Sequence, residues 1–303
     1  MNKILKTLWF HSIGIQKEFI RIFTHFVPHK DRRRIRRDMI ARTKKRYLSQ
    51  YLYSINNEDF KDPITPDTEK YLNNTVWILW LQGEENAPDI VKVCMKYAKK
   101  FKPDGMNVKI VREEDLDKLI KIPDYIYKKW KDKKISNIHF SDIIRVCLLD
   151  KYGGVWLDST VLLTDKIPED ILKADFFALT GQGHLKNNNW FLKSNPNHIL
   201  IKSIKKYLFE YWKQENKLFD YFIYHLFFDL MLERNENLME EWKKIPIYYE
   251  EDCYDFGDVY LFKPYDEKIF NEVLKKTTFH KLKYKYDKKK KIEGTFLEKI
   301  LSL

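Results

Sequence analysis

The stretch HFSDIIRVCLLDKYGGVWLDSTVLLT, residues 139–164, decides the fold because it joins a helix, a glycine turn and a buried strand. Apolar side chains recur at helical spacing in its first half, which predicts one buried helix face. These side chains are Phe140, Ile143, Ile144, Cys147 and Leu148. Gly153 and Gly154 end the helix, since glycine enters left-handed and close-approach backbone conformations without a Cβ penalty. The apolar run 155–157 that follows is typical of a strand buried on both faces.

Three charged side chains accompany these elements. Asp142 and Arg145 lie off the apolar stripe and, three residues apart, are neighbours on the helix surface. Asp158 stands where the strand should end. Alone, each fits a turn cap or a surface ion pair. Because ligands of open α/β sheets bind beyond the carboxyl ends of the strands, we expect the three together to form a substrate site.

The pattern FSD-x-x-R … YGG-x-W-x-D-x-T resembles that of the capsular polysaccharide synthesis glycosyltransferases. These are relatives of the DxD-type sugar transferases, which include the initiating mannosyltransferases and the clostridial glucosylating toxins. The resemblance covers roughly residues 75–285 and implies an α/β fold of the GT-A type, with a mostly parallel, Rossmann-like sheet and flanking helices. It also implies a UDP-sugar donor and, in most relatives, Mn²⁺ or Mg²⁺.

By that resemblance, Asp142 and Arg145 contact the donor sugar, and Asp158 with the adjacent Ser159 belongs to the donor site. Asp158 is the first acid of the DxD motif and the candidate metal ligand. Thr160 stands in place of the second acid. A neutral hydroxyl is a poorer ligand than a carboxylate for a hard divalent cation, so the requirement for a metal stays open.

The preceding segment predicts strands at 76–81 and 107–111 and helices at 88–101 and 115–120, an alternation typical of a parallel α/β sheet. Trp80 and Gln82, at the end of the first of these strands, should border the nucleotide, and the resemblance agrees. Further strands are expected at 174–180 and from Asn187 onward, and helices at 197–214 and 217–234.

Several later polar residues are candidates for the acceptor side or for a lid. Asn189 and Trp190 follow a turn rich in amides, which suits a sugar but equally suits an ordinary loop. Asp220, Tyr221 and His225 lie in a segment that resembles one closing over the site in the family.

The segment FHKLKY, residues 279–284, resembles the closing element of the family. By this resemblance His280 and Lys281 reach the donor diphosphate, where a cation would stabilise the charge of the leaving group. Lys283 and Lys285 are interpreted as a solvated basic tail.

Residues 1–66 predict a basic helical arm in front of a GT-A domain at 67–303, with a break at 62–67. Its apolar, aromatic face beside Lys and Arg is typical of a helix lying on an anionic membrane surface, although the face could equally pack on the domain. No segment is apolar enough to span a bilayer, and no signal peptide is recognised. Three widely spaced cysteines indicate neither a disulfide framework nor a zinc cluster. We therefore expect a cytoplasmic protein, peripheral at the inner face of the cell membrane.

The function expected is transfer of a hexose, galactose or glucose favoured, from a UDP-sugar to a lipid-linked or oligosaccharide acceptor in capsular or exopolysaccharide synthesis. The resemblance implies retention of configuration. The net charge of +12 calls for an anionic partner. A basic nucleic-acid-binding protein is one alternative, but the sequence shows no zinc-finger spacing or RNA-recognition motif, and no nucleic acid is expected as partner. A catalytically inactive relative that still binds sugar is the other, motivated by Thr160.

Overall fold

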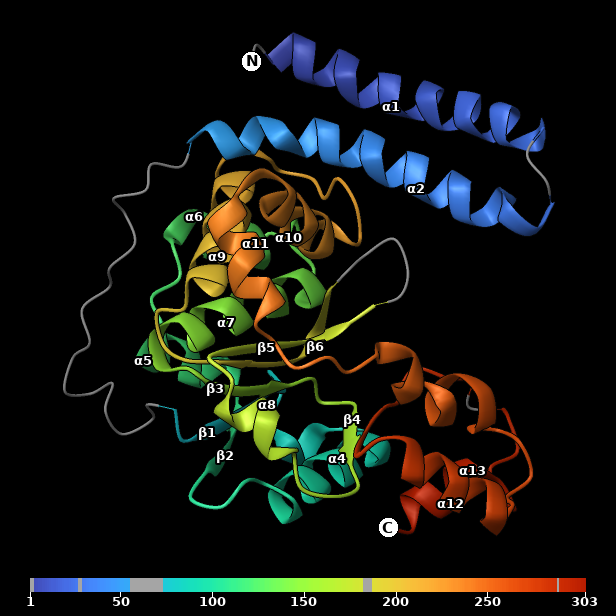
Figure 1. The fold of residues 1–303 in the computed structure, drawn as a ribbon. Coiled ribbons are helices and arrows are strands. Elements are labelled where there is room, and N and C mark those ends of the chain that lie inside the picture. The colour runs from blue at the N-terminus through green and yellow to red at the C-terminus, as the bar shows by residue number, and fades with distance from the viewer. Residues whose placement is uncertain (1–2, 27–28, 55–72, 182–186, 288) are drawn as a thin grey trace.

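The computed structural model describes residues 3–26, 29–54, 73–181, 187–287 and 289–303 (Figure 1). The strands are β1 (Thr75–Leu79), β2 (Asn107–Val111), β3 (Gly154–Leu157), β4 (Val161–Leu163), β5 (Phe176–Thr180), β6 (Asn187–Ser194) and β7 (Phe279–Lys281). The helices are α1 (Lys3–Phe23), α2 (His29–Leu48), α4 (Asp89–Lys100), α5 (Leu116–Leu119), α6 (Asp124–Lys131), α7 (Asn137–Tyr152), α8 (Glu169–Lys173), α9 (Ile199–Gln214), α10 (Ile223–Arg234), α11 (Glu236–Lys243), α12 (Glu267–Lys276) and α13 (Phe296–Leu301).

The central sheet has the strand order β2-β1-β3-β6-β5. β1 pairs in parallel with both β2 and β3, whereas β6 runs antiparallel to β3 and to β5. Four of the five strands of this sheet therefore point the same way, and only β6 is reversed. This confirms the α/β fold class and the mostly parallel sheet flanked by helices.

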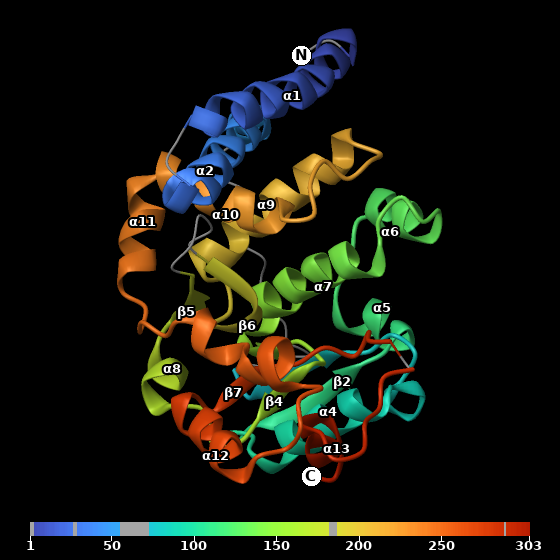
Figure 2. The same cartoon turned by 90° about the vertical axis from the view of Figure 1, so that its right-hand side faces the viewer.

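The two faces of the sheet bury different side chains because successive residues of a strand point to opposite sides. Trp77 and Trp156 enter the core formed with α7, α9 and α10, and Val76 and Val155 enter the core formed with α4, α12 and α13. The two groups of helices lie on opposite sides of the sheet in Figures 1 and 2. Burial on both faces explains why β1 and β3 are continuous apolar runs.

The turn between α7 and β3 requires glycine. Gly154 has φ +90°, and a Cβ there would lie 2.3 Å from the carbonyl oxygen of Thr75 on β1. The indole of Trp77 donates a hydrogen bond to the carbonyl of Gly153 at 2.9 Å. The glycine pair therefore lets helix, turn and strand pack closely, as the sequence predicts.

The second of the two predicted late helices begins later than expected. Residues 217–222 form a loop, and α10 begins only at Ile223. Asp220 accepts a hydrogen bond from the backbone N–H of Phe222 at 3.0 Å, a local turn that competes with helix formation. Asp220 and Tyr221 consequently lie on a loop and not on the helix.

The N-terminal arm is a helical hairpin of α1 and α2, of which α2 packs against α10 (Figure 1). Lys45 of α2 pairs with Glu233, and Tyr47 stacks on Phe219 with ring centroids 4.5 Å apart. The expected break at 62–67 and the domain boundary after residue 66 lie outside the described residues. Among the helices described, none combines the length and apolarity that a bilayer crossing requires.

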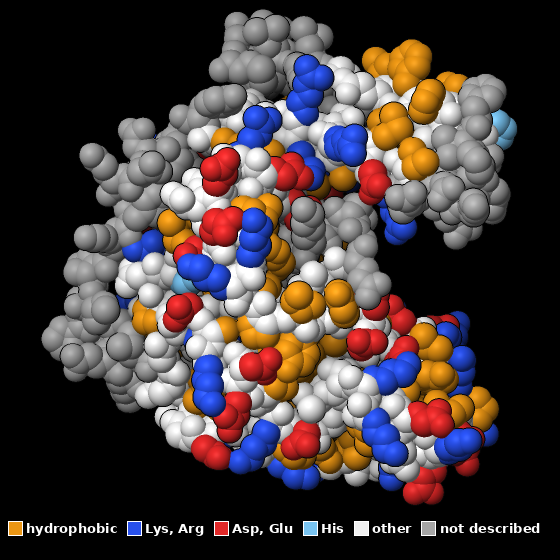
Figure 3. Space-filling model, in the orientation of Figure 1, with side chains coloured by type: hydrophobic (Ala, Val, Ile, Leu, Met, Phe, Trp, Pro, Cys, Tyr) orange, Lys and Arg blue, Asp and Glu red, His pale blue; other side chains and the backbone are white. Residues whose placement is uncertain are grey.

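Four apolar side chains of α1 do not pack on the domain. Its exposed fractions are 60% for Ile15, 68% for Phe19, 58% for Ile22 and 62% for Phe23. Hydrophobic side chains gather on the arm, beside Lys and Arg, in Figure 3. Of the two interpretations of this face, packing against the domain is therefore excluded for these four residues.

Candidate active site

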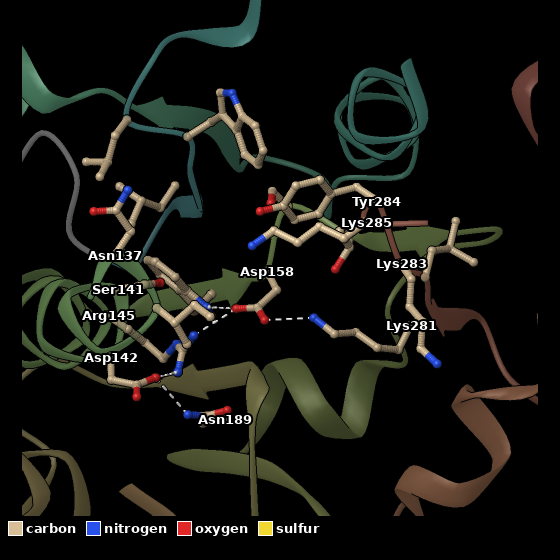
Figure 4. Close-up of a pocket in the computed structure, with 18 of the residues that line it drawn as sticks. Asn137, Ser141, Asp142, Arg145, Asp158, Asn189, Lys281, Lys283, Tyr284 and Lys285 are labelled. Atoms are coloured by element: carbon tan, nitrogen blue, oxygen red, sulfur yellow. Dashed lines mark hydrogen bonds and ion pairs between the residues drawn. The ribbon is translucent and has the colours of Figure 1, made fainter. Parts of the chain in front are cut away.

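A cavity of about 610 Å³ opens at the carboxyl ends of β1 and β3 (Figure 4). Trp80 and Gln82, which follow β1, form one side, and Asp158, Ser159 and Thr160, which follow β3, form its floor. The first turns of α7, the segment from β7 onward, Asn189 of β6 and residues at and before the start of α10 also line it. This volume is typical of a small-molecule site, and its place at the sheet edge is the one that the sequence predicts.

Arg145 is the centre of a buried charge network. Its Nη1 donates to Asp142 Oδ1 at 2.6 Å and its Nη2 donates to Asp158 Oδ1 at 2.8 Å. The guanidinium lies 4.9 Å from the ring centroid of Trp156, and only 4% of the side chain is exposed. Asn189 of β6 donates to Asp142 Oδ1 at 2.9 Å. Helix α7 thereby places Asp142 and Arg145 against the end of β3.

Asp158 is held between two cations. Lys281 Nζ donates to its Oδ2 at 2.7 Å, and the Trp156 indole donates to its Oδ1 at 3.0 Å. Burial would raise the pKa of Asp158, but Lys281 and Arg145 outweigh it and lower that pKa below its ordinary value. Burial does raise the pKa of Asp142, against the effect of Arg145. Asp158 is therefore ionised at neutral pH.

Strand pairing brings Lys281 to this position from the far end of the chain. β4 and β7 are antiparallel, with Val161 opposite Lys281, and the N–H of Leu282 donates to the carbonyl of Thr160 at 2.8 Å. The residues after Asp158 thus align directly with the residues around Lys281. This long-range pairing lies beyond what local sequence patterns predict.

The same strand turns His280 away from the cavity. Neighbouring strand residues face opposite sides, so His280 is fully buried, with its ring centroid 4.7 Å from that of Phe256. Burial lowers its pKa to about 4, so the ring is neutral at pH 7. The expectation that His280 reaches the diphosphate is corrected on both grounds.

Lys283 and Lys285 line the cavity together with Tyr284, and both are exposed, so the interpretation as a solvated segment fits their exposure but not their place at the cavity. Lys283 Nζ pairs with Asp258 at 2.5 Å. The Tyr284 ring meets Trp80 edge-on, with centroids 5.4 Å apart. The recurrence of lysine at 281, 283 and 285 was the available signal that this segment brings positive charge to the cavity.

Comparison with known proteins places the chain. A family model described as capsular polysaccharide synthesis protein matches residues 21–300. The chain belongs to this family. A comparison with curated proteins found no match. Among solved structures, the chain is similar to one titled PaToxG Glycosyltransferase, with a TM-score of 0.39 and 14% sequence identity over 68% of this chain and 84% of that chain.

Two other residues predicted for the acceptor side or a lid lie outside the cavity. Trp190 is 4% exposed, and its indole donates to the Tyr254 hydroxyl at 3.0 Å. Lys281 Nζ lies 5.6 Å from the Trp190 ring centroid, so Trp190 supports a lining residue without lining the cavity itself. Asp220 pairs with Lys44 of α2 at 2.5 Å.

The remaining candidates line the cavity. Asn189 lies beside Asp142, and Tyr221 and His225 form part of the wall contributed by the loop before α10 and by α10 itself. Sequence reasoning missed Ser141 and Asn137 from the first turns of α7, which also line it. Asn137, Ser141 and Arg145 follow one another at intervals of four, so they share one helix face, and this spacing before Arg145 was the available signal.

The side chains present do not fit a divalent metal ion well. Within the described part of the chain, no group of three or more His, Cys, Asp and Glu side chains is placed to hold one. Asp158 already accepts hydrogen bonds from two cations, and Thr160, in the place of the second acid, is 7% exposed.

Proposed function

We propose that this protein is a glycosyltransferase that moves a hexose, galactose or glucose, from a UDP-sugar to a hydroxyl of a lipid-linked or oligosaccharide acceptor. The observation that carries the proposal is Asp158, held at the end of β3 between Arg145 and Lys281 on the wall of a ligand-sized cavity. Membership of the capsular polysaccharide synthesis family supports the same conclusion.

The lining divides into parts that suit the parts of such a donor. Trp80 and Gln82 offer an aromatic face and an amide to the base. Lys281 and its neighbouring lysines suit the diphosphate, since ammonium groups neutralise phosphate oxygens. Asp142 and Asn189, polar and largely buried, suit the hydroxyls of the sugar.

In the proposed reaction the bond between the anomeric carbon and the diphosphate oxygen breaks, and the acceptor oxygen bonds to that carbon on the same face. The hydroxyl proton passes to the departing diphosphate, so the products are the glycoside and UDP, with configuration retained. Lys281 stabilises the negative charge that develops on the leaving group. Arg145 holds the carboxylates of Asp142 and Asp158 in place, and these carboxylates would position the donor. Such positioning contributes to the rate of transfer without a strong protein base.

The acceptor would enter beside Tyr221 and His225. Tyr221 is 57% exposed, Ile138 in the first turn of α7 is 49% exposed, and both line the cavity. An apolar rim around a polar site suits an acceptor that carries sugar hydroxyls and a lipid.

The arm supports attachment to an anionic membrane, which would place the protein at the inner face where such acceptors are assembled. Exposed Phe19 and Phe23 lie on the same helix as exposed Lys17 and Arg21. Such a helix inserts its apolar face at the lipid headgroup level while its cations meet acidic lipids. We expect co-sedimentation with phosphatidylglycerol vesicles, little with phosphatidylcholine alone, and loss of binding in Phe19→Glu. Equal binding of wild type and variant would contradict this attachment.

The test of the reaction is a panel of UDP- and GDP-sugars, measured for binding and for slow hydrolysis. We expect one UDP-hexose to be turned over, and Asp158→Asn to abolish turnover while the variant stays folded by circular dichroism. Donor binding without turnover, with any acceptor offered, would identify the inactive relative. No binding of any nucleotide sugar, together with salt-sensitive affinity for nucleic acid, would refute the proposal in favour of the nucleic-acid-binding alternative.

A further inference from the structure

The position in front of Asp158 is already filled by a protein cation. Asp158 Oδ2 accepts from Lys281 Nζ at 2.7 Å, and Oδ1 accepts from Arg145 at 2.8 Å and from Trp156 at 3.0 Å. A hard divalent ion needs several free oxygen ligands around it. Here it would have to displace Lys281 and settle beside Arg145 as well.

Among the described residues that line the cavity, the one other carboxylate is Asp142, which already pairs with Arg145. Thr160 offers only a neutral hydroxyl, and Asp142 Oδ1 is occupied by Arg145 at 2.6 Å and by Asn189 at 2.9 Å. Four cationic and two carboxylate side chains line the cavity, histidine apart, so the formal charge of its lining is +2. Such a lining repels a divalent cation and attracts a diphosphate.

We propose that Lys281 takes the place of the metal ion, and that the protein binds the donor diphosphate through Lys281 and Lys285 without a divalent cation. This inference rests on the proposed function and concerns the same site. Figure 4 shows Lys281 and Lys285 extending toward Asp158 from one segment, whereas Lys283 points away and pairs with Asp258. An ammonium group has three donors, so Lys281 can hold Asp158 and a phosphate oxygen at once.

Lys281 is built into the fold. Its backbone is fixed by pairing with Val161, its ammonium lies 5.6 Å from the centroid of the Trp190 ring, and 19% of its side chain is exposed. A cation positioned before the donor binds needs little reorganisation when charge develops on the leaving diphosphate. The ion pair with Asp158 thus keeps Lys281 in place for the donor.

The experiment is calorimetric titration of the full chain with UDP, first in excess EDTA and then in saturating Mn²⁺ or Mg²⁺. We expect the same affinity in all three conditions. Lys281→Gln should weaken UDP binding in EDTA by about 10-fold to 100-fold, the effect of losing one charge-assisted hydrogen bond. The matched control is Lys263→Gln, which removes an exposed lysine of the same C-terminal region and should leave the affinity unchanged.

Each outcome decides a different point. UDP binding that requires Mn²⁺ or Mg²⁺, or Lys281→Gln binding UDP as tightly as the wild type, would overturn the metal-free inference and leave the proposed transferase standing. No UDP binding in any condition would refute the proposed function itself, and this inference with it. If Lys281→Gln fails to fold, Lys285→Gln, an exposed lining residue, should still weaken UDP binding in EDTA, and an unchanged affinity would count against the proposal.

Discussion

Replacing Arg145 by Met should destabilise the protein strongly because it leaves two carboxylates without their shared cation. Arg145 donates to Asp142 at 2.6 Å and to Asp158 at 2.8 Å, and its side chain is 4% exposed. Removing one partner of such a buried network typically costs about 3–5 kcal/mol of unfolding free energy. In this variant Asp158 keeps its ion pair with Lys281. Most of the lost unfolding free energy should therefore come from Asp142, whose side chain is 9% exposed.

The origin of this loss can be tested with a second substitution. If the unpaired charge of Asp142 is the cause, Arg145→Met combined with Asp142→Asn should recover about half of the lost free energy. The assay is equilibrium unfolding in urea, with Lys173→Met as control, because Lys173 pairs with Glu169 at 2.6 Å but both side chains are more than 75% exposed. That control should unfold like the wild type. A double variant no more stable than Arg145→Met alone would refute the charge argument.

Three further predictions follow from other parts of the structure. The pKa of fully buried His280 lies at about 4, below its ordinary value, so its stabilising effect is complete above pH 6.5 and is lost as pH falls toward 4. Unfolding free energy measured over this interval should fall by about 3 kcal/mol from this group, a part of the slope that His280→Leu should remove. Gly154→Ala should cost at least about 2 kcal/mol, seen as a lower melting temperature, because the residue has φ +90° and its Cβ would meet the Thr75 carbonyl; an unchanged melting temperature would contradict this. Asp220→Ala, which breaks the ion pair with Lys44, should raise the KM for the acceptor and leave UDP affinity unchanged; a change in UDP affinity with an unchanged acceptor KM would contradict it.

The sequence predicts the centre of the site well because its signals there are local. Asp142 and Arg145 share one helix face, and two glycines mark where α7 ends and β3 begins. The sheet edge then places Asp158 beside them. Helical spacing and a glycine turn can be recognised in a short window, so this part needs no knowledge of distant contacts.

The C-terminal wall is harder to predict because one residue of register decides which side chains face the cavity. His280 and Lys281 are adjacent, yet the first is buried against Phe256 and the second meets Asp158. A shift by one residue in a strand exchanges its two faces. The register follows from pairing between β4 and β7, which are more than a hundred residues apart, and nothing in the segment itself specifies it.

Helix α2 of the arm contacts the loop that forms the proposed acceptor side of the cavity. Lys44 of α2 pairs with Asp220, two residues before Phe222, and Tyr47 stacks on Phe219 of the same loop. That loop also carries Tyr221, which lines the cavity. The proposed donor side is formed by residues at the ends of β1, β3 and β7, and it includes none of these contacts. Under the proposed function, a membrane bound to α1 would act through α2 on the wall that carries Tyr221 and not on the wall that carries Lys281. On that proposal the two substrates would meet different parts of the chain: the arm would influence how the acceptor reaches the cavity, and Lys281 beside Asp158 would hold the donor.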